Sequence, residues 1–137
     1  MRVLKVGGSL VLALCLAGTV YAHHSAAGID QTKSVTQEGI VKEFKWANPH
    51  SWLEIEVKDA KGVAQIWNLE MQPPTFLVRA GWKSSTVKPG DKIKFEARPF
   101  KNGDPGGLFM SVTLADGKVL TQRPAAPAAA PRPAEQK

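Results

Sequence analysis

The segment 52–58 limits what this chain can fold into more than any other. Leu53, Ile55 and Val57 are separated by single glutamates. Apolar residues at every second position indicate a strand with one face in the core and the other face in water. Such a strand needs neighbouring strands, and similar patterns occur before and after it in the sequence.

The other strand patterns predict which residues face the core. They occur at 35–46, 63–69, 92–97 and 108–114, with a short end piece at 118–120. Gly39 in the first of them predicts a β-bulge or a sharp bend. The predicted inward residues outside 52–58 are Ile40, Phe44, Trp46, Val63, Trp67, Leu69, Ile93, Phe95, Ala97, Leu108, Met110, Val112 and Leu114, whereas Phe109 is predicted to face outward.

One segment between the third and fourth strand patterns has helical character. Pro73 and Pro74 stand where a short helix would begin, and Gly81 stands where it would end. Phe76 and Ala80 are one helical turn apart, so we expect this pair to pack against the sheet.

The order of these elements predicts the fold class. Three strands, a short helix and two more strands is the order of an all-β OB-fold, a small five-stranded Greek-key barrel. An open sandwich of similar strands is the alternative, and the helix between strands three and four argues against it. We predict the OB-like barrel.

The first 22 residues have the composition of an export signal. A basic start is followed by a short apolar run at 10–17 and by Val20-Tyr21-Ala22, which fits a cleavage site. The apolar run is shorter than the roughly 20 residues that span a bilayer. We expect cleavage before His23, loss of the only cysteine, a periplasmic or secreted location and no membrane span.

The composition also predicts how the remaining chain is divided. We expect a cleaved signal peptide at 1–22, an N-terminal arm at 23–34 and the barrel domain at 35–122. Residues 123–137 consist largely of Pro and Ala, which predicts a disordered tail. The formal net charge is +6, but Lys residues alternate with Asp and Glu, so no basic stripe is expected.

Several different short motifs lie along the predicted mature chain. They are His23-His24-Ser25, Trp46-Ala47-Asn48-Pro49-His50, Trp67-Asn68-Leu69-Glu70, Arg79-Ala80-Gly81-Trp82 and Lys88-Pro89-Gly90-Asp91. Together they resemble a family of exported bacterial proteins of unknown function. The resemblance covers most of the mature domain, and it implies no activity and no site residue because that family has no established function.

The histidines predict a metal site. Cleavage gives His23 a free α-amine beside its own imidazole, and His24 follows directly. An amine, its ring nitrogen and a second imidazole form a nitrogen site that suits Cu(II), which leads the divalent affinity order. We predict copper binding by His23, His24 and His50. Met71 or Met110 can add a soft axial ligand, but Met110 lies on the predicted core face, where packing is its expected role.

A structural role fits the same histidines. His23 and His24 can be the polar start of a mobile arm, and His50 can hydrogen-bond a neighbouring carbonyl where a strand begins. The sequence leaves both interpretations open.

Exposed aromatic side chains predict a different kind of site. OB barrels bind ligands through one sheet face and its loops, and aromatic rings stack on sugars or bases. We predict a ligand-binding set of Trp52, Trp46 and Glu54 for a small ligand, a glycan or a protein. Alternatively, Trp46, Trp67 and Trp82 fill the barrel. Export and the carboxylates beside Trp52 argue against nucleic acid.

No motif makes a positive case for catalysis. Glu54 and Glu56 lie two apart on one strand face, but such carboxylates are usually solvated. Ser25 and Ser51 each follow a histidine, yet nothing marks an orienting acid or an oxyanion pocket. We expect a non-enzymatic binding protein.

Overall fold

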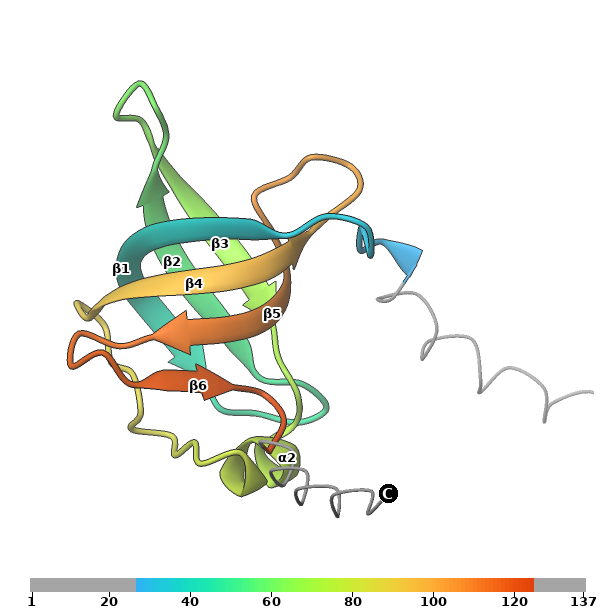
Figure 1. Ribbon diagram of the computed structural model, residues 1–137, viewed down its shortest axis with the longest axis vertical. Coiled ribbons are helices and arrows are strands. Elements are labelled where there is room, and N and C mark those ends of the chain that lie inside the picture. Colours follow the sequence, from blue (N-terminus) through green and yellow to red (C-terminus); the bar gives the residue numbers. More distant parts are fainter. Residues whose placement is uncertain (1–26, 125–137) are drawn as a thin grey trace, which may run out of the picture.

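The computed structural model describes residues 27–124. Within this range six strands form one strongly curved sheet, and helix α2 lies at one end of it (Figure 1). The elements are β1 (Val35–Lys45), β2 (Trp52–Lys58), β3 (Ala64–Glu70), α2 (Pro74–Arg79), β4 (Lys92–Pro99), β5 (Gly106–Thr113) and β6 (Val119–Thr121).

The sheet closes into the predicted barrel. The strand order is β3-β2-β1-β4-β5-β6, and β3 also pairs in parallel with β5. This extra pairing joins Asn68 to Gly106 and Glu70 to Leu108, so β1 to β5 form a complete ring. The OB-like five-stranded barrel with a short helix between β3 and β4 is therefore confirmed. Strand β6 continues the sheet along β5.

Helix α2 lies across one end of the barrel (Figure 1). Leu77 enters the core from this helix, and Trp82, which follows it, is only 1% exposed. The Trp82 ring packs against Phe109 and Phe44, with ring centroids 5.5 and 5.7 Å apart. The β1–β2 loop, α2 and the end of β6 gather at this end of the molecule (Figure 1).

A β-bulge in β1 changes which residues face the core. Val41 pairs with Ile55 and Glu43 pairs with Glu54, so Lys42 is an extra residue in β1. One extra residue reverses the alternation. Val41 is therefore buried, and the prediction that Ile40 faces the core is wrong because Ile40 precedes the bulge and is 37% exposed. Phe44 and Trp46 follow the bulge and pack against the core as predicted.

Gly39 is not the bulged residue that the sequence predicted. A Cβ atom at this position would lie 2.5 Å from the carbonyl oxygen of Glu56 and 2.6 Å from Cγ2 of Ile55. Glycine is needed here because β1 crosses β2 too closely to carry a side chain.

Strand β5 contains a second bulge with the same effect. Glu96 pairs with Ser111 and Ala97 pairs with Phe109, so Met110 is the extra residue. Phe109 is consequently buried, and the prediction that it faces outward is wrong. Leu108 and Met110 are only partly buried, whereas Val112, beyond the bulge, is buried as predicted.

Two further predicted contacts differ in the structure. In helix α2 the buried residue is Leu77, whereas Phe76 is 52% exposed, so the prediction that Phe76 packs on the barrel is wrong. The third strand begins at Ala64, which leaves Val63 exposed in the β2–β3 hairpin. Leu69 is buried and Trp67 packs against the core, as predicted.

The described part of the N-terminal arm is held against β4. Ile29 is buried and pairs with Phe100, and Lys101 N–H donates to the carbonyl of Gly28. Hydrogen bonds from the side chain and backbone of Thr32 lower the pKa of the Asp30 carboxyl.

The predicted signal peptide and nearly all of the predicted tail lie outside the described residues. Among residues 27–124, no helix has both the length and the apolar character that crossing a membrane requires.

Candidate functional site

The most distinctive polar contact joins His50 to Glu70. Nδ1 of His50 lies in hydrogen-bond contact with Oε1 of Glu70. The Glu70 side chain is 9% exposed, whereas the His50 side chain is 41% exposed. The carboxylate is thus much more buried than the imidazole that it contacts.

The backbone holds these two side chains together. His50 is the second-last residue of the β1–β2 loop, and Glu70 is the last residue of β3. Ser51, which is fully buried, donates from N–H to the carbonyl of Gln72 at 3.4 Å and accepts from Met71 N–H at 2.9 Å. The loop and the end of β3 are therefore bonded to each other directly beside the pair.

Trp52 and Lys45 lie on the same outer face as Glu70. In the sheet, Lys45 is opposite Trp52, and Trp52 is opposite Glu70. Directly opposite residues share a face, with Cβ atoms about 4.5–5.5 Å apart. We call the four residues His50, Glu70, Trp52 and Lys45 the His50 surface. It combines an accessible ring nitrogen, a half-buried indole, a buried carboxylate and an ammonium group.

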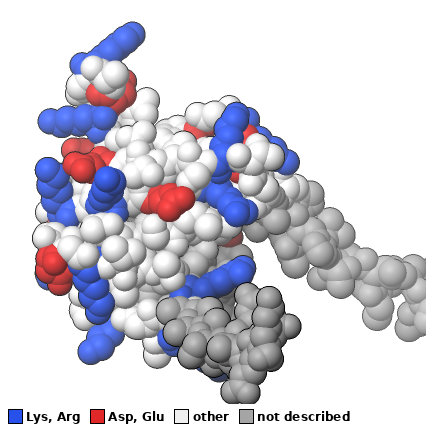
Figure 2. All heavy atoms as spheres, viewed as in Figure 1, with Lys and Arg blue, Asp and Glu red and all other residues white. Residues whose placement is uncertain are grey.

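Charges on the barrel are mixed in sign. Lys42 pairs with Glu56 at 3.3 Å and Lys45 with Glu43 at 3.7 Å. Figure 2 shows Lys and Arg side chains interspersed with Asp and Glu on the left of the visible face.

Of the three predicted copper-binding histidines, the structure describes His50. His23 and His24 lie outside the described residues, so their position relative to His50 stays a prediction. Across residues 27–124, no group of three or more His, Cys, Asp and Glu side chains is placed to hold a metal ion. His50 is the one histidine among these residues.

The described arm begins away from His50. Gly28 bonds to Lys101 in the β4–β5 loop, whereas His50 lies beside the connection from β3 to α2. Figure 1 shows the start of the arm and the β1–β2 loop at separate places on the barrel. His23 precedes Gly28 by five residues, which span at most roughly 18 Å when fully extended.

The two methionines considered as axial ligands differ in position. Met71 is 1% exposed and belongs to the core, so its thioether packs against apolar neighbours. Met110 is the extra residue of the β5 bulge and is partly buried. Neither is in a hydrogen-bonded or ionic contact with the His50 surface.

The predicted ligand-binding residues occupy different environments. Trp46 packs edge-on to Phe44, with ring centroids 5.7 Å apart, and lies against the core. Trp52 and Glu54 are half-buried on the outer face of β2, where Glu54 is opposite Asn68 of β3. Trp52 is therefore the aromatic residue of this set that belongs to the His50 surface.

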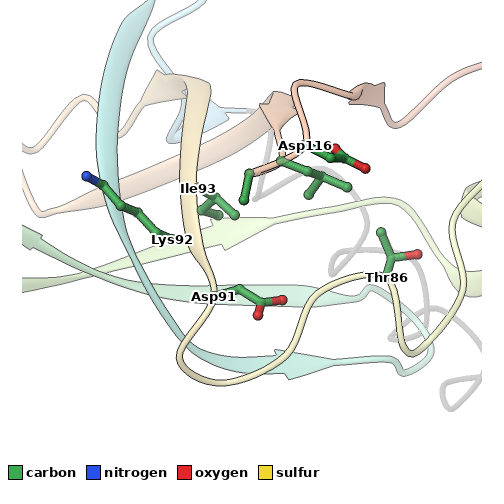
Figure 3. A pocket seen from close by; sticks show the side chains of 7 residues that line it. Thr86, Asp91, Lys92, Ile93 and Asp116 are labelled. Atoms are coloured by element: carbon green, nitrogen blue, oxygen red, sulfur yellow. The ribbon is translucent and has the colours of Figure 1, made fainter.

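A cavity of about 260 Å³ lies elsewhere, between the start of β4 and the β5–β6 turn. Its lining includes Thr86, Asp91, Ile93 and Asp116, and the Lys92 side chain points away from the other labelled ones (Figure 3). None of the sequence-predicted site residues lines it. The volume is below the roughly 300–1,000 Å³ of typical small-molecule pockets.

Sequence reasoning missed Glu70 as a site residue. Glu70 is an outward-facing glutamate of a strand, as Glu54 and Glu56 are, but these two are more exposed than Glu70 is. No periodic pattern distinguishes the three glutamates. The one available signal was the motif Trp67-Asn68-Leu69-Glu70, which ends on this residue.

Comparison with known proteins gives a family but no activity. The family model described as "Family of unknown function (DUF6152)" matches residues 11–110. No curated protein matches the chain. The match agrees with the resemblance found in the sequence motifs.

Proposed function

The chain belongs to the DUF6152 family of unknown function, and we propose that it is an exported, non-enzymatic copper-binding protein. Copper would be held by the imidazole of His50 together with the α-amine and ring of His23 at the mature amino terminus. His24 would supply a further nitrogen where the geometry requires it.

One observation carries the proposal: the buried Glu70 carboxylate contacts Nδ1 of the half-exposed His50 ring, whose second nitrogen has no hydrogen-bond partner among residues 27–124. Histidines that bind metals typically have this arrangement, in which a carboxylate contacts the ring nitrogen that does not bind the metal. The mature amino terminus supports the proposal from the sequence side, because an amine and imidazoles suit Cu(II) better than harder cations.

The first experiment compares two amino termini. The protein is produced with its natural cleavage, so that His23 is the first residue, and Cu(II) is titrated against it and against a form that begins with Met before His23. We expect a sub-micromolar Kd for the natural form and a large loss of affinity for the capped form, because the capped chain has no free amine on His23.

The second experiment tests the folded part of the site. We expect His50→Ala to weaken Cu(II) binding by more than the roughly 10–100-fold that is typical when an outer-shell partner is lost. If His50→Ala binds copper like the natural form, only a local chelate of the terminal histidines remains, and the proposed site is wrong.

A second candidate function uses the same surface differently. Trp52 is half-buried on the outer face, directly opposite both Lys45 and Glu70. An indole beside charged groups suits a small ligand or a glycan, because the ring stacks while the polar groups hydrogen-bond. Trp52→Ala would abolish binding in a glycan array and leave the copper Kd unchanged. Equal glycan binding by the natural protein and by Trp52→Ala would exclude this candidate.

A further inference from the structure

We propose that the free edge of strand β3 is a homodimer interface, at which two copies of this chain pair their β3 strands antiparallel. In this dimer Ala64 of one copy lies opposite Ile66 of the other, and Gln65 lies on the two-fold axis. The proposal is independent of copper binding, because it uses residues 63–67 and not the His50 surface.

The first argument is that β3 has a strand on both sides only near its end. Strand β2 pairs with all of β3, from Ala64 to Glu70, whereas β5 pairs only with residues 68–70. Within the described residues 27–124, the segment 64–67 therefore has no strand on its second side. This part of β3 belongs to the hairpin that projects from the barrel in Figure 1.

The second argument is the direction of the backbone groups. Asn68 N–H donates to the carbonyl of Pro105, just before β5, at 3.4 Å, so the backbone groups of Asn68 point away from β2. Alternate residues of a strand direct their N–H and C=O groups to the same side. Ile66 and Ala64, two and four positions earlier, therefore present two donors and two acceptors at the free edge.

The third argument is that this edge lacks the usual protection against association. Natural edge strands carry charges, Pro or bulges. Residues 62–69 include no charged residue and no Pro, and the β2–β3 register has no bulge. Val63 is 56% exposed and Ile66 is 40% exposed. At the other end of the strand order, β6 has three residues, and the carbonyl of Thr121 already accepts from Trp82.

One register uses all four backbone groups. When Ala64 lies opposite Ile66 of the second copy, the two residues exchange two hydrogen bonds, and the two-fold axis repeats them. A shift by two residues brings in Gly62 or Asn68 instead, whose N–H groups are already hydrogen-bonded within the chain. A shift by one residue places outward side chains of one copy opposite inward side chains of the other.

Side chains also match in size in this register. Ile66 lies opposite the small Ala64 of the second copy. On the other face of the sheet, the exposed Val63 lies opposite Trp67, which is half-buried. Pairs of an aromatic and a β-branched side chain stabilise neighbouring strands, and the two-fold axis forms this pair twice.

Charges beside the edge are complementary in the same register. In the β2–β3 ladder, Glu56 lies opposite Ile66 and Lys58 lies opposite Ala64. The row that contains Glu56 and Ile66 of one copy continues through Ala64 to Lys58 of the other copy. The charges nearest to the interface in each row are therefore opposite in sign, which favours this pairing over a partner with the same charge.

Disulfide cross-linking tests the register. Protein with cleavage before His23 lacks Cys15, the single cysteine of the sequence, so an introduced cysteine is its only thiol. Residues opposite each other in a non-hydrogen-bonded pair have Cα atoms about 4.5 Å apart, within the range of a disulfide. We expect Gln65→Cys to form a covalent dimer on mild oxidation. Ile66→Cys is the matched control, because its two copies lie beyond the roughly 7 Å that a disulfide spans.

Sedimentation equilibrium measures the strength of the dimer. We expect the natural protein to show a reversible monomer–dimer equilibrium. Ala64→Pro removes an N–H group that β2 does not use, so the barrel keeps its pairing, and we expect the dissociation constant of the dimer to rise at least about tenfold. Ile66→Lys should have the same effect without changing the backbone, because it places a second lysine beside Lys58.

Val78→Lys is the control for apolar exposure in general. Val78 is 59% exposed but lies on α2, so its substitution should leave the dissociation constant unchanged. Circular dichroism confirms that each variant is folded.

Three results would overturn the proposal. The first is a natural protein that stays monomeric at about 1 mM, the Kd of a very weak complex. The second is a dimer whose dissociation constant is unchanged in both Ala64→Pro and Ile66→Lys, which places the interface elsewhere. The third is cross-linking of Gln65→Cys no faster than that of Ile66→Cys.

Discussion

At the scale of single residues, two adjacent glycines allow the barrel to close. A Cβ atom on Gly106 would lie 2.4 Å from the carbonyl oxygen of Asn68, and one on Gly107 would lie 1.9 Å from that of Arg98. The backbone of β5 approaches both β3 and β4 at this point. Both glycines also have positive φ angles, of 141° and 152°. The predicted strand pattern begins at residue 108, whereas the strand in the structure begins at Gly106.

Gly107→Ala is therefore expected to be costly. A strained backbone and an overpacked contact each cost about 1–3 kcal/mol, so we expect a loss of roughly 2–6 kcal/mol in the free energy of unfolding. Urea denaturation followed by tryptophan fluorescence measures it.

Gly103→Ala is the matched control for this substitution. Gly103 also has a positive φ, of 84°, but no atom lies within 4 Å of a Cβ built there. Only the backbone cost of about 1–2 kcal/mol is expected. Equal losses in the two variants would contradict the close approach of β5 to β4.

The two residues of the candidate site differ in how far the sequence revealed them. His50 was recognised from the sequence because it is a histidine at an Asn-Pro corner, away from the other two. Its partner Glu70 was not, because the two residues lie 20 positions apart and meet only when β2 pairs with β3. A hydrogen bond between strand ends leaves no local pattern.

At the scale of elements, helix α2 closes one end of the barrel with a single buried side chain. Leu77 is 0% exposed, whereas its neighbour Phe76 is mostly exposed. The helix has six residues and no side-chain cap, so packing rather than intrinsic propensity holds it in place.

Truncating the two side chains of α2 should therefore have unequal effects. We expect Leu77→Ala to cost about 2–5 kcal/mol through the cavity that it leaves. Phe76→Ala should stay within about 0.5 kcal/mol because its ring contributes little buried area. Thermal unfolding by circular dichroism measures both. A larger loss from Phe76→Ala would mean that the helix is rotated from its described orientation.

At the scale of the whole molecule, the last described residues bind segments that are distant in sequence. Gln122 accepts from Gln72 N–H at 3.0 Å and donates to the carbonyl of Phe109 at 2.6 Å. Trp82 Nε1 donates to the carbonyl of Thr121 at 2.8 Å. Leu120 is buried in the core. Strand β6 therefore joins α2, β5 and the end of β3 into one cooperative unit.

Two truncations test this unit. A chain that ends at Pro124 removes only the Pro/Ala-rich segment and should keep its Tm within about 4 °C. A chain that ends at Lys118 loses strand β6 with its pairing to β5, a buried leucine and the three side-chain hydrogen bonds described above, and its Tm should fall by more than about 10 °C. Similar Tm values for the two chains would show that β6 is not part of the cooperative fold.

From the sequence alone, the fold class and the order of the elements followed correctly. Alternation of apolar and charged residues, turn residues and a Pro-to-Gly segment are local properties, and local properties specify strands and helices. Within 52–58, where the alternation has no interruption, every predicted inward residue is buried.

Other features depended on contacts between distant segments. The bulges at Lys42 and Met110 reverse the alternation in half of β1 and half of β5, because one extra residue exchanges the two faces of a strand. Whether a strand contains a bulge depends on how its neighbours curve around the core. Glu70 came to lie under His50 for the same physical reason: strand pairing, and not any local pattern, brought a carboxylate and an imidazole to one place.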